Sequence, residues 1–282
     1  MPREFTPAAK ARRSLQTTYV KRIWNPFVAA AKQYRLIEAG DRIAVCVSGG
    51  KDSFLLAMLM AMLHEHSDVP FELVLLSMNP GYNDENARRV HDNAALLGLD
   101  VVFFDADIFD TVAKMDGSPC YVCARMRRGH LYKEAQARGC NKIALGHHFN
   151  DVIETTLMSM LYGAQIQSMP PKLKSRNYEG MQLIRPLYHV REDDIIAWKN
   201  HNQLQFIQCA CRFTEHCTAC TPDDGGSKRQ EMKRLIRELR KTHPDVEKCI
   251  FQSTRNVRLD TMIAYTHHGQ EHSFLEDFSP PE

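Results

Sequence analysis

The most informative stretch of the sequence is Arg42-Ile43-Ala44-Val45-Cys46-Val47-Ser48-Gly49-Gly50-Lys51-Asp52-Ser53-Phe54-Leu55-Leu56. Its β-branched apolar run from Ile43 to Val47 stops at two glycines, and apolar residues then recur at helical spacing from Phe54 to Leu63. The pattern predicts a strand, a tight turn and a helix. Such a turn directs unpaired backbone N–H groups and the positive end of a helix dipole at one point, where a phosphate or pyrophosphate can bind.

The residues of this turn also suit an anion chemically. The glycines let the backbone approach a ligand closely, Lys51 adds a point charge, and Ser48 and Ser53 add short donors. The alternative is an ordinary glycine turn with a surface lysine. The hexapeptide SGGKDS resembles the PP-loop, SGGxDS, of the N-type ATP pyrophosphatases, and it lacks the GxxxxGKS/T pattern of a Walker A loop. The resemblance implies an enzyme that binds ATP, transfers AMP to a substrate oxygen and releases pyrophosphate, with ATP bound by Ser48, Gly49, Gly50, Lys51, Asp52 and Ser53 and catalytic roles for Lys51 and Asp52.

Composition places the chain among ordinary soluble globular proteins. Its 282 residues are 44% hydrophobic and 25% charged, which allows one large α/β domain or one domain with small appendages. No apolar run reaches membrane-spanning length, and the N-terminus has no apolar signal core, so we expect a cytoplasmic protein without a membrane partner. The net charge of +2 is too small to indicate nucleic acid by itself, so an RNA surface must come from local clusters of basic residues.

Apolar runs and helical patterns alternate along the chain. Strands are expected at 71–78, 101–104 and 142–145, and helices at 84–97 and 123–137. This alternation predicts βαβ units and an open, mainly parallel sheet flanked by helices, which with the PP-loop is an α/β fold of the adenine-nucleotide alpha hydrolase type with helical and cysteine-rich additions. Ligands on such sheets bind at the carboxyl ends of the strands, where the PP-loop lies.

Three segments are expected. Residues 1–40 form a basic, mainly helical lead-in, which is either a solvated charged face or an arm that contacts RNA or a second copy of the chain. Residues 41–205 form the PP-loop ATP pyrophosphatase domain with the CxxC motif. Within it, 163–190 are expected to be a mobile basic loop with a short strand-like stretch at 183–187, and 191–203 a helix. Residues 206–282 hold a cysteine-rich segment, a basic amphipathic helix over 227–241 and a C-terminal tail.

A second polar loop follows the strand 142–145. The sequence Gly146-His147-His148-Phe149-Asn150-Asp151 leads into a helix, and it resembles the GHxxxDxxET stretch of the tRNA-thiolating and lysidine-forming PP-loop enzymes. The match implies that Gly146 and His147 bind ATP and that Glu154 lies nearby. It gives Asp151 a role in catalysis or in holding Mg²⁺. Helix capping alone is the other explanation for Asn150 or Asp151.

Six of the nine cysteines fall in two groups, which indicates metal or redox chemistry. Cys120 and Cys123 form a CxxC motif at a predicted helix start, where the dipole and nearby arginines favour thiolates. A redox disulfide, half of a zinc site and part of an iron–sulfur cluster all fit this motif. The second group is Cys209, Cys211, Cys217 and Cys220. Cys46, Cys140 and Cys249 stand singly beside apolar residues and read as small buried hydrophobes.

The order SGGKDS, PCxxCxxxRRG, GHHxxDxxET, then a further cysteine before a basic helix, resembles the tRNA 2-thiocytidine synthetase family over nearly the whole chain. The resemblance implies adenylation of the C2 oxygen of cytidine 32 in tRNA and its replacement by sulfur. It also implies a 4Fe-4S cluster on Cys120, Cys123 and one later cysteine, with one iron open for a sulfur species. Better-known members carry Pro-Cys-x-x-Cys before the basic helix, and this chain departs from that pattern. We assign the third ligand to Cys209, with Cys211 as the alternative, because Phe206-Ile207 best matches the apolar strand that precedes the family's cysteine. Cys217 and Cys220 form a second zinc site or have no role.

The remaining expectations concern partners. Arg127 either neutralises the transferring phosphoryl group, a catalytic role, or contacts tRNA phosphate, as is expected of Arg128. We also expect a cysteine desulfurase or another sulfur donor as a partner, and a homodimer. Thiolation of a tRNA uridine, lysidine formation and a non-catalytic ATP-binding redox or metal sensor are the alternatives. The expected tRNA footprint is basic and scattered along the chain, with Lys10, Arg12, Arg13, Arg128, Lys172, Lys174, Arg176, Lys228, Arg229, Lys233, Arg234 and Arg237.

Overall fold

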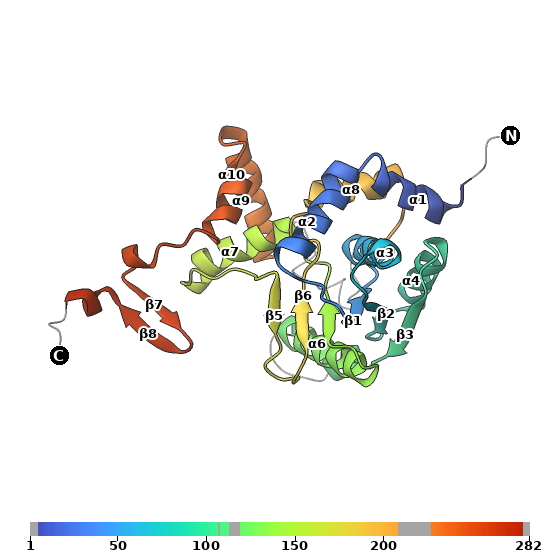
Figure 1. The fold of residues 1–282 in the computed structure, drawn as a ribbon, viewed down its shortest axis with the longest axis horizontal. Coiled ribbons are helices and arrows are strands. Elements are labelled where there is room, and N and C mark those ends of the chain that lie inside the picture. The colour runs from blue at the N-terminus through green and yellow to red at the C-terminus, as the bar shows by residue number, and fades with distance from the viewer. Residues whose placement is uncertain (1–4, 107, 113–118, 208–226, 279–282) are drawn as a thin grey trace.

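The computed structural model describes residues 5–106, 108–112, 119–207 and 227–278. A six-stranded sheet in the order β3-β2-β1-β4-β6-β5 forms its centre (Figure 1). Every neighbouring pair is parallel except β5 and β6, so the predicted open, mainly parallel sheet is confirmed. The strands are β1 (Arg42–Cys46), β2 (Glu72–Asn79), β3 (Val101–Asp105), β4 (Lys142–Ala144), β5 (Lys172–Lys174) and β6 (Gln182–Ile184).

Helices cover both faces of the sheet, because successive side chains of a strand point to opposite sides. Ile43 and Val45 of β1 pack in one core with α3 (Lys51–His66). Ala44 and Cys46 pack in another with Tyr132 of α6 (Pro119–Ala137). A run of α3 from Ser53 to Met60 is fully buried, which explains why this helix is apolar on all sides. The helix α4 (Asp84–Leu96) connects β2 to β3, and the short helix α5 (Ile108–Val112) follows β3.

The N-terminal segment forms α1 (Pro7–Gln16), a π-helix η1 (Val20–Trp24) and α2 (Asn25–Gln33), as the helical expectation for 1–40 required. The apolar side of this segment is buried against the rest of the protein, so the segment does not project as an arm. Leu15, Ile23 and Phe27 are completely buried in the same core as α3 and α8 (Glu192–His201). The basic side chains are what this segment presents to solvent.

Two helices after the cysteine-rich segment pack on α7 (Phe149–Gly163). They are α9 (Lys228–Thr242) and α10 (Val246–Ser253), and Phe149, Ile153, Ile236 and Phe251 join them in one cluster. Beyond them come the 3₁₀ turns η3 (Leu259–Thr261) and η4 (Phe274–Phe278) and the hairpin of β7 (Ala264–His267) and β8 (Gln270–Ser273). This hairpin projects away from the sheet (Figure 1), and the sequence pattern predicted neither it nor α10. None of the described helices is long and apolar enough to cross a membrane.

The prediction of a loop over 163–190 was wrong in part. The antiparallel strands β5 and β6 form the edge of the sheet there, and β6 also pairs with β4. Leu183 and Ile184 are buried on opposite faces, which holds the hairpin in register. Lys172 and Lys174, which indicated a loop, lie in β5 itself, and the prolines at 170, 171 and 186 lie next to the two strands.

Candidate active site at the carboxyl ends of β1 and β4

The centre of the sheet is a topological switch point. From β1 the chain first continues to β2 on one side and later returns to β4 on the other, and a crevice opens at the carboxyl ends of such strands. The PP-loop follows β1 and the Gly146-His147-His148 loop follows β4. The two loops touch, since a Cβ on Gly146 would stand 3.1 Å from the carbonyl carbon of Asp52 and the nitrogen of Ser53. Glycine at 146 is therefore what lets the loops meet.

Within the PP-loop, Gly49 adopts φ +88°, which L side chains rarely take, and its carbonyl accepts a hydrogen bond from Ile207 N at 3.3 Å. Gly50 is the N-cap of α3 and brings no side-chain cap. Ser53 Oγ instead accepts from Ser48 N at 3.1 Å and donates to Gly50 O at 2.9 Å. The first turn of α3 thus presents backbone amides that no described side chain caps, as an anion site requires.

Lys51 is held between two carboxylates. Its Nζ lies 3.1 Å from Asp52 Oδ2 and 3.1 Å from Glu192 Oε1. Burial lowers the pKa of Lys51, but the two carboxylates outweigh burial and the net pKa is raised. Glu192, the first residue of α8, was missed as a site residue. Burial would raise its pKa, yet the hydrogen bond from Lys233 and the charge of Lys51 lower it to about 2.

Asp52 has one oxygen without a partner. Its Oδ1 is buried and accepts no hydrogen bond from any described residue, and His148 Nε2 lies 3.8 Å away. A buried acceptor left in this state costs about 1–3 kcal/mol. A cation or donor that arrives with a ligand would remove that cost, so Asp52 fits a magnesium ion bound with ATP.

Asp151 is already engaged on both oxygens. Oδ2 accepts from His148 N at 2.9 Å, and Asp151 N donates to His148 Nδ1 at 3.4 Å, so the pair forms a capping box at the start of α7. Oδ1 lies 2.5 Å from Arg229 Nη1. Burial raises the pKa of Asp151, but the charge and N–H of His148 together with Arg229 outweigh burial, so the net pKa is lowered. The structure thus shows the capping role, and the catalytic role stays a prediction.

The basic helix α9 reaches into this site. Arg229 Nη1 also lies 3.2 Å from Glu154 Oε2, and Lys233 Nζ lies 2.7 Å from Glu192 Oε2. Burial raises the pKa of Glu154 to about 7 although Lys233 and Arg229 stand beside it. Arg229 and Lys233, which we assigned to tRNA, therefore pair with carboxylates here, and their contact with tRNA stays a prediction.

His147 faces a second buried cation. Its Nδ1 accepts from Arg185 Nε at 3.3 Å. Burial lowers the pKa of His147 to about 4 and the pKa of Arg185 to about 10. Arg185, only 7% exposed, was missed because an arginine after an apolar strand gives no signal of its own.

Tyr82 connects the PP-loop to the core cluster against which Cys123 of α6 packs. Tyr82 Oη donates to the carbonyl of Ser48 at 3.2 Å. Burial raises the pKa of Tyr82, the charge of Arg127 opposes this rise, and Cys123 adds to it. Cys123 also packs against apolar side chains of two core clusters. Tyr82 was missed, although it lies only three residues after Asn79, the last residue of β2.

The other predicted residues lie apart from this site or outside the described residues. Lys172 pairs with Glu38 at 3.0 Å, and Lys228 Nζ lies 4.6 Å from the ring centroid of Tyr162. Arg128, Lys174 and Arg176 are exposed. Cys120 lies in the first turn of α6. Among the described residues no three metal-binding side chains converge. The four later cysteines lie outside the residues that the structure describes: Cys209, Cys211, Cys217 and Cys220.

The crossover sheet, its switch point and the uncapped glycine loop define a PP-loop domain, and the family model described as a PP-loop domain matches residues 17–211. Relatives named tRNA-cytidine(32) 2-sulfurtransferase match over most of the chain. The one from Geotalea daltonii is 36% identical over 86% of this chain and 94% of its own length. The one from Anaeromyxobacter dehalogenans strain 2CP-C is 37% identical over 81% of this chain and 76% of its own length. The chain belongs to the tRNA-cytidine(32) 2-sulfurtransferase family.

A solved structure supports the fold independently. The chain is similar to the U34-tRNA thiolase NcsA from Methanococcus maripaludis with its 4Fe-4S cluster, with a TM-score of 0.63. Sequence identity is 20%, and the match covers 82% of this chain and 77% of the other. At this identity the likeness concerns the fold alone.

Proposed function

We infer that the protein is an ATP-dependent tRNA sulfurtransferase that adenylates the C2 oxygen of cytidine 32 and replaces it with sulfur. One observation carries this inference: Tyr82 donates a hydrogen bond to Ser48 of the PP-loop and belongs to the core cluster against which Cys123 of α6 packs. The groups that activate an oxygen and the thiols that handle sulfur thus share one edge of the sheet. The relatives of this chain carry the name of that reaction.

The PP-loop is proposed to hold ATP. The amides of Gly50–Ser53 and the ammonium group of Lys51 would stabilise the pyrophosphate that leaves when the base oxygen attacks the α-phosphorus. Gly146 and His147 come from the adjoining loop. Because burial lowers the pKa of His147 to about 4, its ring is neutral at neutral pH, and with Nδ1 accepting from Arg185 its Nε2 N–H can donate a hydrogen bond. Arg127 is proposed to neutralise the transferring phosphoryl group.

Magnesium is proposed to bind Asp52. Its Oδ1 is the carboxylate oxygen without a hydrogen bond, whereas both oxygens of Asp151 are occupied by His148 N and Arg229. Asp151 would reach a metal only after Arg229 has moved. In the present geometry Asp151 therefore acts on the site by fixing the start of α7 and the His148 ring.

The residues of the chain fit a 4Fe-4S cluster at this edge. Cys120 and Cys123 are one helical turn apart on α6, so they lie on one side of the helix. Ile207 donates to Gly49 O, and Cys209 follows two residues later, a length of chain that spans at most about 7 Å. We propose these three thiols as the ligands, with Cys211 as the alternative third. Bound there, the cluster would supply an open iron that carries a sulfur species.

Partners follow from the same reaction. tRNA is the proposed substrate, with Arg128, Lys174, Arg176 and Lys228 among its exposed contacts, and a cysteine desulfurase or another sulfur donor provides the sulfur. A homodimer is supported by exposed apolar side chains on the projecting C-terminal segment, since Ile263 is 81% and Phe278 77% exposed. We place the reaction in the cytoplasm, where tRNA is modified.

The test is thiolation of unmodified tRNA by anaerobically prepared protein with Mg-ATP and sulfide, followed by mass analysis of the nucleosides. We expect 2-thiocytidine, one pyrophosphate released per thiolation, and loss of iron and product in Cys123→Ala. Thiouridine as the product would replace the proposed nucleoside, and lysidine would remove sulfur from the reaction. Binding of ATP without tRNA-dependent pyrophosphate release would favour the alternative function, a non-catalytic ATP-binding redox or metal sensor.

A further inference from the structure

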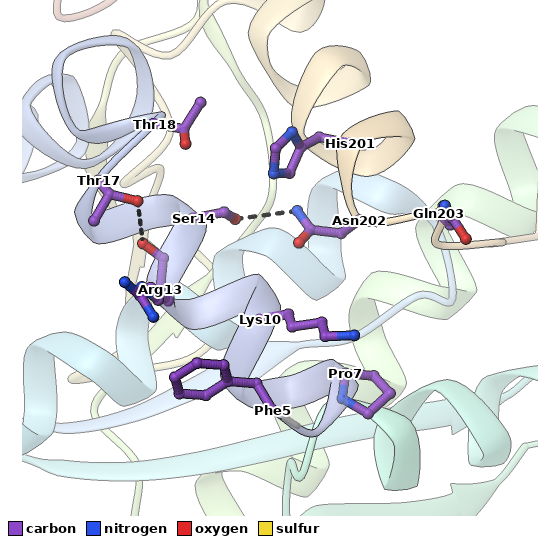
Figure 2. Close-up of a pocket in the computed structure, with 10 residues that line it drawn as sticks. All are labelled: Phe5, Pro7, Lys10, Arg13, Ser14, Thr17, Thr18, His201, Asn202 and Gln203. Atoms are coloured by element: carbon purple, nitrogen blue, oxygen red, sulfur yellow. Dashed lines mark hydrogen bonds between the residues drawn. The ribbon is translucent and has the colours of Figure 1, made fainter. Parts of the chain in front are cut away.

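An open pocket of about 470 Å³ lies between α1 and the C-terminal end of α8 (Figure 2). Three basic side chains line it: Lys10 and Arg13 from α1, and His201 from α8. None of the described residues around it is acidic. Its volume lies within the range of small-ligand sites, and its lining favours an anion.

The cations of this pocket differ from their neighbours on the same segment. Arg12 pairs with Glu65, and Arg22 pairs with Asp194. Lys10 and Arg13 form no ion pair with any described residue, so their charges are available to a ligand. Carboxylates therefore neutralise Arg12 and Arg22, whereas the charges of Lys10 and Arg13 are not neutralised by any described residue.

Polar groups fix the floor of the pocket. Asn202 Nδ2 donates to Ser14 Oγ at 3.1 Å, as Figure 2 shows, and the buried Ser14 donates to Ala11 O at 2.7 Å. Gln203 follows with φ +54°, a conformation that favours glycine, and its side chain lines the pocket. Phe5 adds an aromatic ring to the pocket, and the Cζ atom of Arg13 lies 5.1 Å from the centroid of this ring.

We propose that this pocket binds a backbone phosphate of the RNA substrate, with Phe5 placed to stack on an adjoining base. RNA fits better than a free nucleotide, because the side chains of Lys10, Arg13 and His201 are all exposed and a strand can run through, whereas small-ligand sites enclose most of the ligand. The C-terminal ends of α1 and α8 face the pocket, and each opposes an anion with about half a charge. Lys10 and Arg13 must therefore supply most of the attraction.

The position of the pocket suits the proposed function, on which this inference rests. Helix α8 begins at Glu192, which contacts Lys51 of the PP-loop, and ends at His201 in the pocket. Ten helical residues span about 15 Å. With about 3.4 Å between stacked nucleotides, an RNA strand whose target base is at the PP-loop places a phosphate in the pocket some four or five nucleotides away.

The test measures tRNA affinity over a salt series for the wild-type protein, Lys10→Ala/Arg13→Ala and Lys10→Glu/Arg13→Glu. Lys248→Ala on α10 removes one exposed charge on the other side of the molecule and is the control. We expect the double alanine variant to bind about tenfold more weakly, with the slope of log affinity against log salt smaller by about 1. The charge reversal should weaken binding further, while the control keeps the wild-type values and ATP affinity is constant throughout.

Wild-type affinity in both double variants would overturn the inference, as would an equal loss in Lys248→Ala. Binding of free AMP that is lost in the double variants, with tRNA affinity unchanged, would make the pocket a nucleotide site and also overturn it. Thiolation by the wild-type protein is measured on the same preparations. If the wild type thiolates tRNA and the variants bind normally, only this inference fails. If the wild type neither binds nor thiolates tRNA, the proposed function fails.

Discussion

The ammonium group of Lys51 lies 3.1 Å from Glu192 Oε1, and Glu192 Oε2 lies 2.7 Å from Lys233 Nζ. One carboxylate thus bridges the PP-loop lysine and the basic helix α9. Since Lys233 also stands 3.8 Å from Glu154 Oε1, charged groups of alternating sign continue from the PP-loop to α7. A displacement of α9 would change the charge that Lys51 experiences.

The first prediction concerns this shared carboxylate. Glu192→Gln removes the charge that orients Lys51, and we expect the KM for ATP to rise about tenfold or more, because hydrogen bonds to charged groups contribute about 1.5–3 kcal/mol. The measurement is pyrophosphate release at varied ATP. Asp193→Asn is the control, since Asp193 is 68% exposed and pairs with Arg240. A variant with the wild-type KM would show that Glu192 does not position Lys51.

Local sequence signals were sufficient for the anion loop. Two glycines between an apolar strand and an apolar helix leave few conformations open, and the structure has the strand, the turn and the helix there. The mainly parallel sheet followed from the alternation of strands and helices along the chain. The CxxC motif was placed on a helix start for the same reason, and α6 begins at Pro119, one residue before Cys120.

Long-range partners could not be read from the sequence. Glu192 appeared to be one of three acidic residues that begin a helix, and Arg229 one of many basic residues on an amphipathic helix. Their meeting with Lys51 and Asp151 depends on how α8 and α9 pack on the sheet, and pairs separated by 78 to 141 residues leave no periodic pattern. Tyr82 was missed because one hydrogen bond to a backbone carbonyl carries no compositional signal.

The two glycines of the PP-loop should respond differently to alanine. Gly49→Ala demands a left-handed backbone at φ +88° and would bring the new Cβ into collision with Ile207 and within 2.8 Å of Val90. We expect a loss of about 2–4 kcal/mol in the free energy of unfolding, from backbone strain and overpacking together. Thermal unfolding without ATP measures it.

Gly50→Ala is the matched variant, because its φ is −82° and a Cβ there meets nothing within 4 Å. We expect wild-type stability but weaker ATP binding if the nucleotide approaches this backbone. Equal destabilisation by the two alanines would contradict the assignment of distinct roles to the two glycines.

The stability of the fold should depend on pH through Glu154. Burial raises the pKa of this carboxyl from its ordinary 4.5 to about 7, so its stabilising contribution is complete below pH 4.5 and disappears as the pH rises through 7. Glu154→Gln removes this dependence. Relative to the wild type, the variant should gain up to about 3 kcal/mol between pH 4.5 and 8, since one pKa unit corresponds to about 1.4 kcal/mol. Urea unfolding at several pH values measures the difference.

Two comparisons make this prediction specific. Glu238→Gln, at an exposed position of α9, should leave the wild-type pH profile unchanged. The pH dependence that His147 gives to stability has the opposite sign. Burial lowers the pKa of His147 from 6.5 to about 4, so its stabilising contribution is present above pH 6.5 and disappears as the pH falls through 4. A Glu154→Gln profile parallel to that of the wild type would mean that Glu154 is ionised in the folded protein at pH 5.

The last prediction separates the role of Tyr82 in the site from its role in packing. Tyr82→Phe removes the donor to Ser48 O, and we expect the free energy of unfolding to fall by about 0.5–1.5 kcal/mol and the KM for ATP to rise severalfold, because the loop carbonyl loses its anchor. Tyr178→Phe removes the same kind of bond, from a tyrosine hydroxyl to Gly129 O at 3.1 Å, on a ring stacked on Tyr132 and away from the PP-loop. That variant should lose similar stability with the wild-type KM. If the two variants change the KM equally, the Tyr82 hydroxyl supports the fold and not the nucleotide site.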